Sequence, residues 1–130
     1  MMKLLDTNIV IRFLLEDSPK QFLLAKKLLN NNNESLVLTD VTFAEIIWLL
    51  TSFYHLSKER VVEKLFGILN LRSIKSNRNV LIRALYFYRN FNIDYIDAYH
   101  AAYSEEENLE GVYSFDEDLD KIKSIKRFKL

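Results

Sequence analysis

The sequence has no cysteine, and among its 130 residues it has only two glycines and one proline. Without cysteine, the chain cannot form a disulfide scaffold, a thiolate zinc site or a cysteine nucleophile. The scarcity of glycine and proline argues against glycine-rich phosphate-binding loops, flexible linkers and turn-dense all-β folds. Apolar residues make up 49% and charged residues 28%. Because this is the balance of a folded globule of ordinary size, we expect a single domain over residues 1–130.

Long apolar runs are also absent. The run Ile9–Leu15 is interrupted by Arg12 and is too short to span a bilayer. No cleavage site with small residues follows it, so we expect neither an export signal nor a membrane segment. The lack of cysteine fits a reducing compartment. The expected location is therefore the cytoplasm.

The chain has no net charge, because 18 Lys and Arg balance 18 Asp and Glu. This excludes a polybasic nucleic-acid binder, but the charges are distributed unevenly. Residues 58–89 hold eight cations and two acids, residues 94–120 hold ten acids and no Lys or Arg, and the last ten residues are basic again. Separate positive and negative regions suit a partner that is itself charged.

The apolar pattern predicts short strands separated by longer helices. Strands are expected at residues 1–5, 36–38, 112–114 and 125–130. Helices are expected over residues 9–15, from residue 40 to about 54, from Asp94 to about Glu107, and briefly over 116–122. Three more helices are expected to begin at Pro19, Ser57 and Asn77. The helix that begins at Pro19 has an apolar face formed by Phe22, Leu23, Leu24, Leu28 and Leu29. This alternation predicts an α/β fold with a parallel sheet covered on both faces. In such folds the functional site lies outside the carboxyl ends of the strands.

Two acids follow expected strands closely. Asp6 comes directly after Lys3-Leu-Leu5, where partial burial would make an unpaired carboxylate costly. Asp116 comes shortly after the strand that starts at Val112. Each acid can instead cap the helix that follows it. Asp118 is either a further metal ligand or an ordinary acid in the first turn of that helix.

Glu45 is surrounded by apolar residues. Its neighbours one helical turn away are Val41, Trp48 and Leu49, which predicts an acid on the apolar side of a helix. Glutamate is almost never fully buried without a partner or a metal ion. No Lys or Arg occurs in residues 29–57 to neutralise it. We favour a functional role, the alternative being an edge position on an amphipathic helix.

Asp94 and Asp97 stand at the start of an expected helix. Asp94 suits the N-cap position, and Asp97 in the first turn gains from the helix dipole. The small residues Ala98, Ala101 and Ala102 follow and allow close packing. We therefore expect Asp97 to face a crowded interior as a metal ligand, with Asp94 in a supporting position.

Taken together, Asp6, Glu45, Asp97 and Asp116 are expected to converge at one edge of the sheet. Unit charges about 6 Å apart repel by roughly 3 kcal/mol at an effective dielectric constant near 20. Such a cluster requires either protonation or a bound cation, and ligands that are all oxygens favour Mg²⁺ or Mn²⁺. The reactions that such ions serve are mostly at phosphorus.

Each of these acids lies in a short segment with recurring neighbours. The segments are Leu4-Leu-Asp-Thr-Asn8, Phe43-Ala-Glu-Ile46, Asp97-Ala-x-x-Ala-Ala102 and Ser114-Phe-Asp-x-Asp118. In their order and spacing they resemble the four acidic motifs of PIN domains, and the similarity covers essentially the whole chain. Within that family the sequence is most similar to the VapC-type toxins of toxin–antitoxin pairs.

The resemblance implies a three-layer α/β/α sandwich around a mostly parallel sheet of four to five short strands. It also implies an Mg²⁺- or Mn²⁺-dependent endoribonuclease that cleaves tRNA or ribosomal RNA, is neutralised by a VapB-like antitoxin and forms a homodimer. The metal ligands would be the four acids named above, with Asp118 as a candidate fifth. Thr7, Asn8 and Ser114 would support them.

RNA binding requires cations, and the candidates are Arg12, which is near Asp6 in sequence, and Lys58, Arg78 and Arg83 in the basic region. The alternative for that region is a solvated helical face. The two histidines, His55 and His100, have no required role in metal-assisted hydrolysis.

Three other functions are alternatives to this assignment. A catalytically idle RNA- or protein-binding module with the same fold is disfavoured by the intact set of acids. A nuclease of general RNA processing, or a deoxyribonuclease, would use the same metal site. A receiver-like domain needs an adjacent acidic pair near the N-terminus and a late Lys beside the site. Asp6 has no acidic neighbour, and no Lys lies between Asp97 and Asp120.

Overall fold

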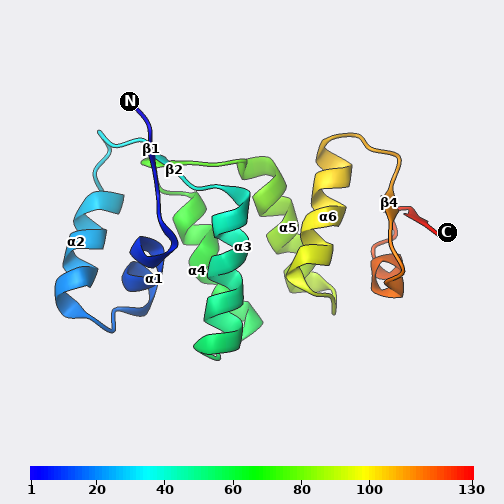
Figure 1. Cartoon of the computed structure of the whole chain (residues 1–130), viewed down its shortest axis with the longest axis horizontal. Helices are drawn as coiled ribbons and strands as arrows, with labels where there is room; N and C mark the ends of the chain where they lie inside the picture. Colours follow the sequence, from blue (N-terminus) through cyan, green and yellow to red (C-terminus); the bar gives the residue numbers. More distant parts are fainter. The chain divides into compact units, whose positions relative to one another are not determined.

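The computed structural model describes residues 1–130, which divide into two units, Met1–Asn77 and Arg78–Leu130 (Figure 1). Both combine helices with short parallel strands, which confirms the α/β class expected from the sequence. None of the helices has the length and hydropathy that a membrane-spanning segment needs.

The sheet of the first unit contains three strands, β1 (Lys3–Leu4), β2 (Leu36–Val37) and β3 (Ile74–Lys75), in the order β1-β2-β3. All neighbours are parallel, with Lys3 opposite Leu36 and Leu36 opposite Ile74. Parallel strands require crossover connections, and here each crossover is helical. The sequence analysis missed β3, because a strand of two residues is defined by its pairing with β2 and has no apolar alternation of its own.

Helices α1 (Thr7–Leu15) and α2 (Pro19–Leu29) connect β1 to β2. Helix α3 (Asp40–Trp48), a π-helical segment η1 (Leu49–Phe53) and helix α4 (Lys58–Leu69) connect β2 to β3. Side chains of Asp6, Thr39 and Ser57 cap α1, α3 and α4. The single helix expected to reach about Tyr54 changes to a π-helix at its end, where the Thr51 hydroxyl donates to the Ile47 carbonyl at 2.8 Å.

The expected apolar face of α2 is wrong in part. Leu23 and Leu24 are 62% and 63% exposed, whereas Ala25 and Leu29 are buried. A buried stripe that contains Ala25 and Leu29 follows i, i+4 spacing, and Leu23 and Leu24 lie off that stripe. A sheet covered on both faces predicts a buried first strand, and this is also wrong, since Lys3 and Leu4 are exposed and only Leu5, which follows β1, is buried.

The second unit contains α5 (Arg78–Asn90), α6 (Tyr95–Glu106), β4 (Val112–Tyr113), a 3₁₀-helix η2 (Glu117–Lys121) and β5 (Arg127–Phe128). Helices α5 and α6 pack against each other, and Ala98, Ala101 and Ala102 are fully buried, as their size predicts. Strand β4 pairs in parallel with β5. The chain thus has five parallel strands, arranged as a sheet of three and a sheet of two.

Gly111 precedes β4, and the backbone of Lys126, just before β5, lies very close to it. A Cβ atom at Gly111 would collide with the Lys126 carbonyl oxygen and would lie 2.9 Å from the Phe128 ring. We expect Gly111→Ala to destabilise the protein by roughly 1–3 kcal/mol, because the overlap forces the strands apart. Gly67 on α4 is the matched control, since nothing lies within 4 Å of its added Cβ. Thermal unfolding should show a lower Tm for Gly111→Ala alone, and equal values for both variants would contradict this account.

Candidate functional site

Two of the predicted ligands, Asp97 and Asp116, meet in the second unit. Asp97 lies in the first turn of α6, and Asp116 follows β4 as the N-cap of η2. The Asp116 carboxylate accepts a hydrogen bond from the Asp118 amide at 2.9 Å, and the Ser114 hydroxyl accepts one from the Asp116 amide at 2.9 Å. The carboxyl groups of Asp97 and Asp116 share a hydrogen bond. The helix start and the strand end therefore bring two acids into direct contact.

The electrostatics of this pair differ between its two members. The pKa of Asp97 is raised to about 6, chiefly by burial and then by the hydrogen bond and negative charge of Asp116, with smaller contributions from Asp94 and Asp118. The pKa of Asp116 is lowered, mainly because its carboxylate accepts the Asp118 amide and then because Asp97 donates to it. The two acids thus share one proton below about pH 6, with Asp97 as its carrier.

This pair has the donor chemistry of a hard-cation site. Its ligand atoms are all carboxylate oxygens, and the shared proton relieves a repulsion that a divalent cation would relieve equally. Asp118, the candidate fifth ligand, forms an ion pair with Lys121 at 2.9 Å. Asp94 occupies the N-cap position of α6 as expected, although its side chain makes no capping hydrogen bond.

The other two predicted ligands belong to the first unit. Asp6 lies just beyond the carboxyl end of β1 and accepts the Asn8 amide at 3.2 Å, which is the capping role considered from the sequence. Glu45 lies on α3, the helix that follows β2. Because β1 and β2 are parallel, Asp6 and the start of α3 lie at the same edge of their sheet.

The expected burial of Asp6 and Glu45 is wrong, because both are exposed. Helix α3 buries a stripe formed by Phe43, Ile46 and Ile47, which Leu50 continues in η1. Val41 and Trp48 lie outside that stripe, 80% and 62% exposed, so Glu45 has apolar neighbours but does not lie in the core. Apolar residues occur on several sides of α3, and their pattern does not by itself identify the buried side.

The structure thus brings together Asp97 and Asp116 and places Asp6 and Glu45 in the other unit. Within neither unit do three or more His, Asp or Glu side chains gather into a group that could hold a metal ion. The convergence of all four carboxylates stays a prediction.

The family model of the PIN domain matches residues 3–125, a range that includes all four acids and runs through both units. The chain belongs to the PIN domain family. PIN domains have a nuclease fold and are generally metal-dependent. A search of curated proteins finds no match to the chain.

The supporting residues of this PIN domain differ in their surroundings. Thr7 is buried in the first turn of α1, while Asn8 is exposed and lines a hollow of about 400 Å³ between α1 and α2 together with Arg12. Ser114 has the clearest supporting role, because its hydroxyl fixes the backbone amide of Asp116.

Arg12 and Arg83, which were predicted to bind RNA, form ion pairs within their own units. Arg12 forms a bidentate ion pair with Asp17 at 2.8 and 2.9 Å, which raises the pKa of the guanidinium. Arg83 donates to Glu105 at 2.8 Å and lies over the Phe87 ring, 4.5 Å from its centroid. Both guanidinium groups therefore have structural roles. Lys58 and Arg78 are the first residues of α4 and α5.

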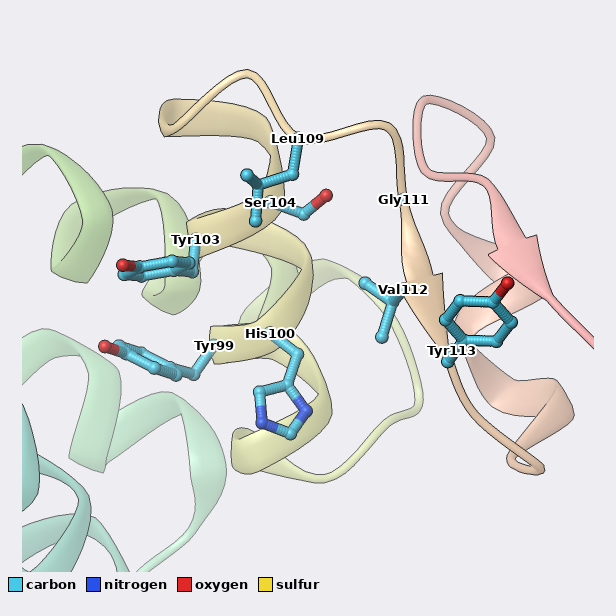
Figure 2. Close-up of a pocket in the computed structure, with 8 residues that line it drawn as sticks. All are labelled: Tyr99, His100, Tyr103, Ser104, Leu109, Gly111, Val112 and Tyr113. Carbon is cyan, nitrogen blue, oxygen red and sulfur yellow. The ribbon is translucent and has the colours of Figure 1, made fainter.

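Sequence reasoning missed a pocket of about 520 Å³ between α6 and β4 of the PIN domain. Its lining includes Tyr99, His100, Tyr103, Ser104 and Val112 (Figure 2). The available signal was the aromatic pair Tyr99-His100, which follows Asp97-Ala98 on the expected helix. Nothing in the sequence alone indicated that β4 would lie opposite these side chains.

Proposed function

We propose that this PIN domain is a metal-dependent endoribonuclease that acts as the toxin of a VapC-type toxin–antitoxin pair, with tRNA or ribosomal RNA as its substrate. The observation that carries the nuclease assignment is the hydrogen-bonded pair Asp97–Asp116 at the end of β4, in a chain that belongs to a family of nuclease folds. The toxin role is supported by the order and spacing of the four acidic segments.

In this proposal, Asp6, Glu45, Asp97 and Asp116 hold Mg²⁺ or Mn²⁺, with Asp118 as an additional ligand. A bound ion of this kind supplies a water of lowered pKa and stabilises the charge that develops on the phosphate oxygens. Asp116 is kept ionised by the Asp118 amide, so it is ready to act as a ligand at neutral pH. Asp97 carries a proton below about pH 6 and loses it before it can bind a cation.

The proposed partners are a VapB-like antitoxin, a second copy of the chain and the RNA substrate. Trp48, Leu23 and Leu24 are each more than 60% exposed and supply apolar surface of the kind that protein partners cover. For the RNA backbone we propose Arg12, Lys58, Arg78 and Arg83, of which Arg12 and Arg83 would have to release Asp17 and Glu105 to contact a phosphate.

Hydrolysis of end-labelled RNA by the purified full chain tests the enzymatic part. We expect cleavage in Mg²⁺ or Mn²⁺, none in EDTA, and products with 5′-phosphate ends. Cleavage that persists in EDTA would overturn the metal-dependent assignment, and cleavage restricted to DNA would favour the deoxyribonuclease.

Induced expression tests the toxin role separately. Wild type should arrest growth and Asp6→Ala should not, with rescue by co-expression of a short antitoxin reading frame from the same locus. Normal growth with the wild type, together with RNA cleavage in vitro, would favour general RNA processing.

A further inference from the structure

The pocket between α6 and β4 is lined by two segments, and each of them continues to one acid of the pair Asp97–Asp116. Along α6, His100 and Ser104 lie about one and two turns beyond Asp97. Along β4, Val112 is followed by the segment that ends at Asp116. Because Asp97 and Asp116 are hydrogen-bonded to each other, the two segments converge at these carboxyl groups. A molecule in the pocket would therefore lie next to a phosphate bound at the acids.

The residues that line the pocket include aromatic side chains and hydrogen-bonding groups. Figure 2 shows Tyr99 and Tyr103 one above the other on α6, and their ring centroids are 6.0 Å apart. Both rings extend from α6 to the side away from Val112 (Figure 2), and Tyr103 is 41% exposed, so a flat ligand can reach its ring at the rim of the pocket. His100 and Ser104 supply imidazole nitrogens and a hydroxyl, and Val112 extends from β4 toward α6 (Figure 2). Unpaired RNA bases are bound by this combination of stacking and hydrogen bonds.

The lining of the pocket distinguishes a base from a phosphate as the occupant. It contains no Lys or Arg, and Arg127 on the neighbouring strand β5 forms an ion pair with Asp120. A phosphate group would find no Lys or Arg in the lining to neutralise it, whereas an uncharged heterocycle needs none. The volume of about 520 Å³ is within the range of small-ligand pockets and accommodates one nucleoside.

We propose that this pocket binds one nucleobase of single-stranded RNA, beside the phosphate that is cleaved at the acidic pair. The proposal rests on the proposed nuclease function and deepens it, because it assigns the base preference next to the cleavage position to α6 and β4. His100 and Tyr103 are the specificity residues. The enzyme should accordingly select one or two of the four bases at a single position flanking the cut.

The chain has only two histidines, which makes proton NMR of the intact protein a direct test. His55 belongs to the first unit and serves as an internal control, and His100→Gln assigns the two imidazole signals. Titration with the four uncharged ribonucleosides should shift the His100 signals saturably with at least one of them, and should leave His55 unchanged. No shift with any nucleoside, or equal shifts at both histidines, would overturn the proposal.

Two variants sharpen the measurement. Tyr103→Ala removes the stacking ring, and we expect the dissociation constant of the preferred nucleoside to rise roughly five- to a hundredfold. Phe53→Ala removes an aromatic ring that is 66% exposed in the first unit and should leave the constant unchanged. An equal loss of affinity in both variants would show that the effect is not specific to the pocket.

The two proposals fail separately. Metal-dependent RNA hydrolysis by the wild type with no response of His100 would refute the base pocket and leave the nuclease assignment intact. A saturable His100 shift without hydrolysis in any metal would refute the nuclease and leave a nucleoside-binding pocket. When both hold, sequencing of RNA ends should show a base preference for the wild type that is lost in Tyr103→Ala.

Discussion

Asparagine in place of Asp116 should reduce metal-dependent RNA hydrolysis by roughly a thousandfold or more, because a neutral amide cannot replace an ionised metal ligand that supports the transition state. The change is nearly isosteric. The asparagine side-chain oxygen can still accept the Asp118 amide, so the N-cap of η2 is preserved. Initial rates with labelled RNA in Mn²⁺, at pH 7.5 and equal protein concentration, provide the measurement.

Glu117→Gln is the matched control for Asp116→Asn. It makes the same chemical change one residue along the chain, at an exposed acid in the first turn of η2. Its activity should remain within about twofold of the wild type, since loss of one surface charge alters little beyond the local field. A similar loss of activity in both variants would indicate a general charge effect and contradict the role of Asp116.

The same reasoning applies to Asp6, which belongs to the first unit. If Asp6 and Asp116 serve one metal centre, each Asn variant alone should remove most of the activity, and the double variant should be little worse than either. Multiplicative losses would show that the two residues act independently. The predicted convergence of the four acids would then be wrong, even if each acid mattered for activity.

The fold was predictable to the extent that its determinants are local. Pro19 opens α2 and Asp94 precedes α6, and both follow from well-understood preferences at helix ends. Strand β3 was not predictable in this way, because two residues in a strand carry no pattern. The length of α3 was overestimated because a π-helical segment preserves the apolar spacing while it changes the hydrogen bonding.

The candidate site shows the same division between local and non-local information. A carboxylate offers about four acceptor positions, so the capping roles of Asp6 and Asp116 leave room for a ligand role as well. Sequence alone presented capping and metal binding as alternatives, although one side chain can do both. The contact between Asp97 and Asp116 joins two elements that are separate in sequence, and only the packing of α6 with η2 and β4 determines it.

The raised pKa of Asp97 predicts that Asp97→Asn stabilises the metal-free protein at neutral pH. The carboxyl group has a pKa of 3.8 when unperturbed and about 6 in the folded protein, so the folded state binds the proton more tightly. The free energy of unfolding should therefore fall as the pH rises from about 4 to about 6. The shift corresponds to at most about 3 kcal/mol, and partial solvent access reduces the expected gain at pH 8 to roughly 1–2 kcal/mol.

Urea unfolding in EDTA at pH values from 4 to 8 measures this effect. The difference between Asp97→Asn and the wild type should be close to zero at pH 4 and should reach its full value above pH 6. Asp120→Asn is a control of opposite sign, because Arg127 lowers the pKa of Asp120 through a bidentate ion pair at 3.0 Å, and its loss should destabilise the protein at pH 8. A gain in stability for Asp97→Asn that does not vary with pH would contradict the linkage between protonation and folding.

Mn²⁺ should compete with the proton on Asp97, so the affinity of the wild type for Mn²⁺ should fall by about tenfold for each pH unit below 6.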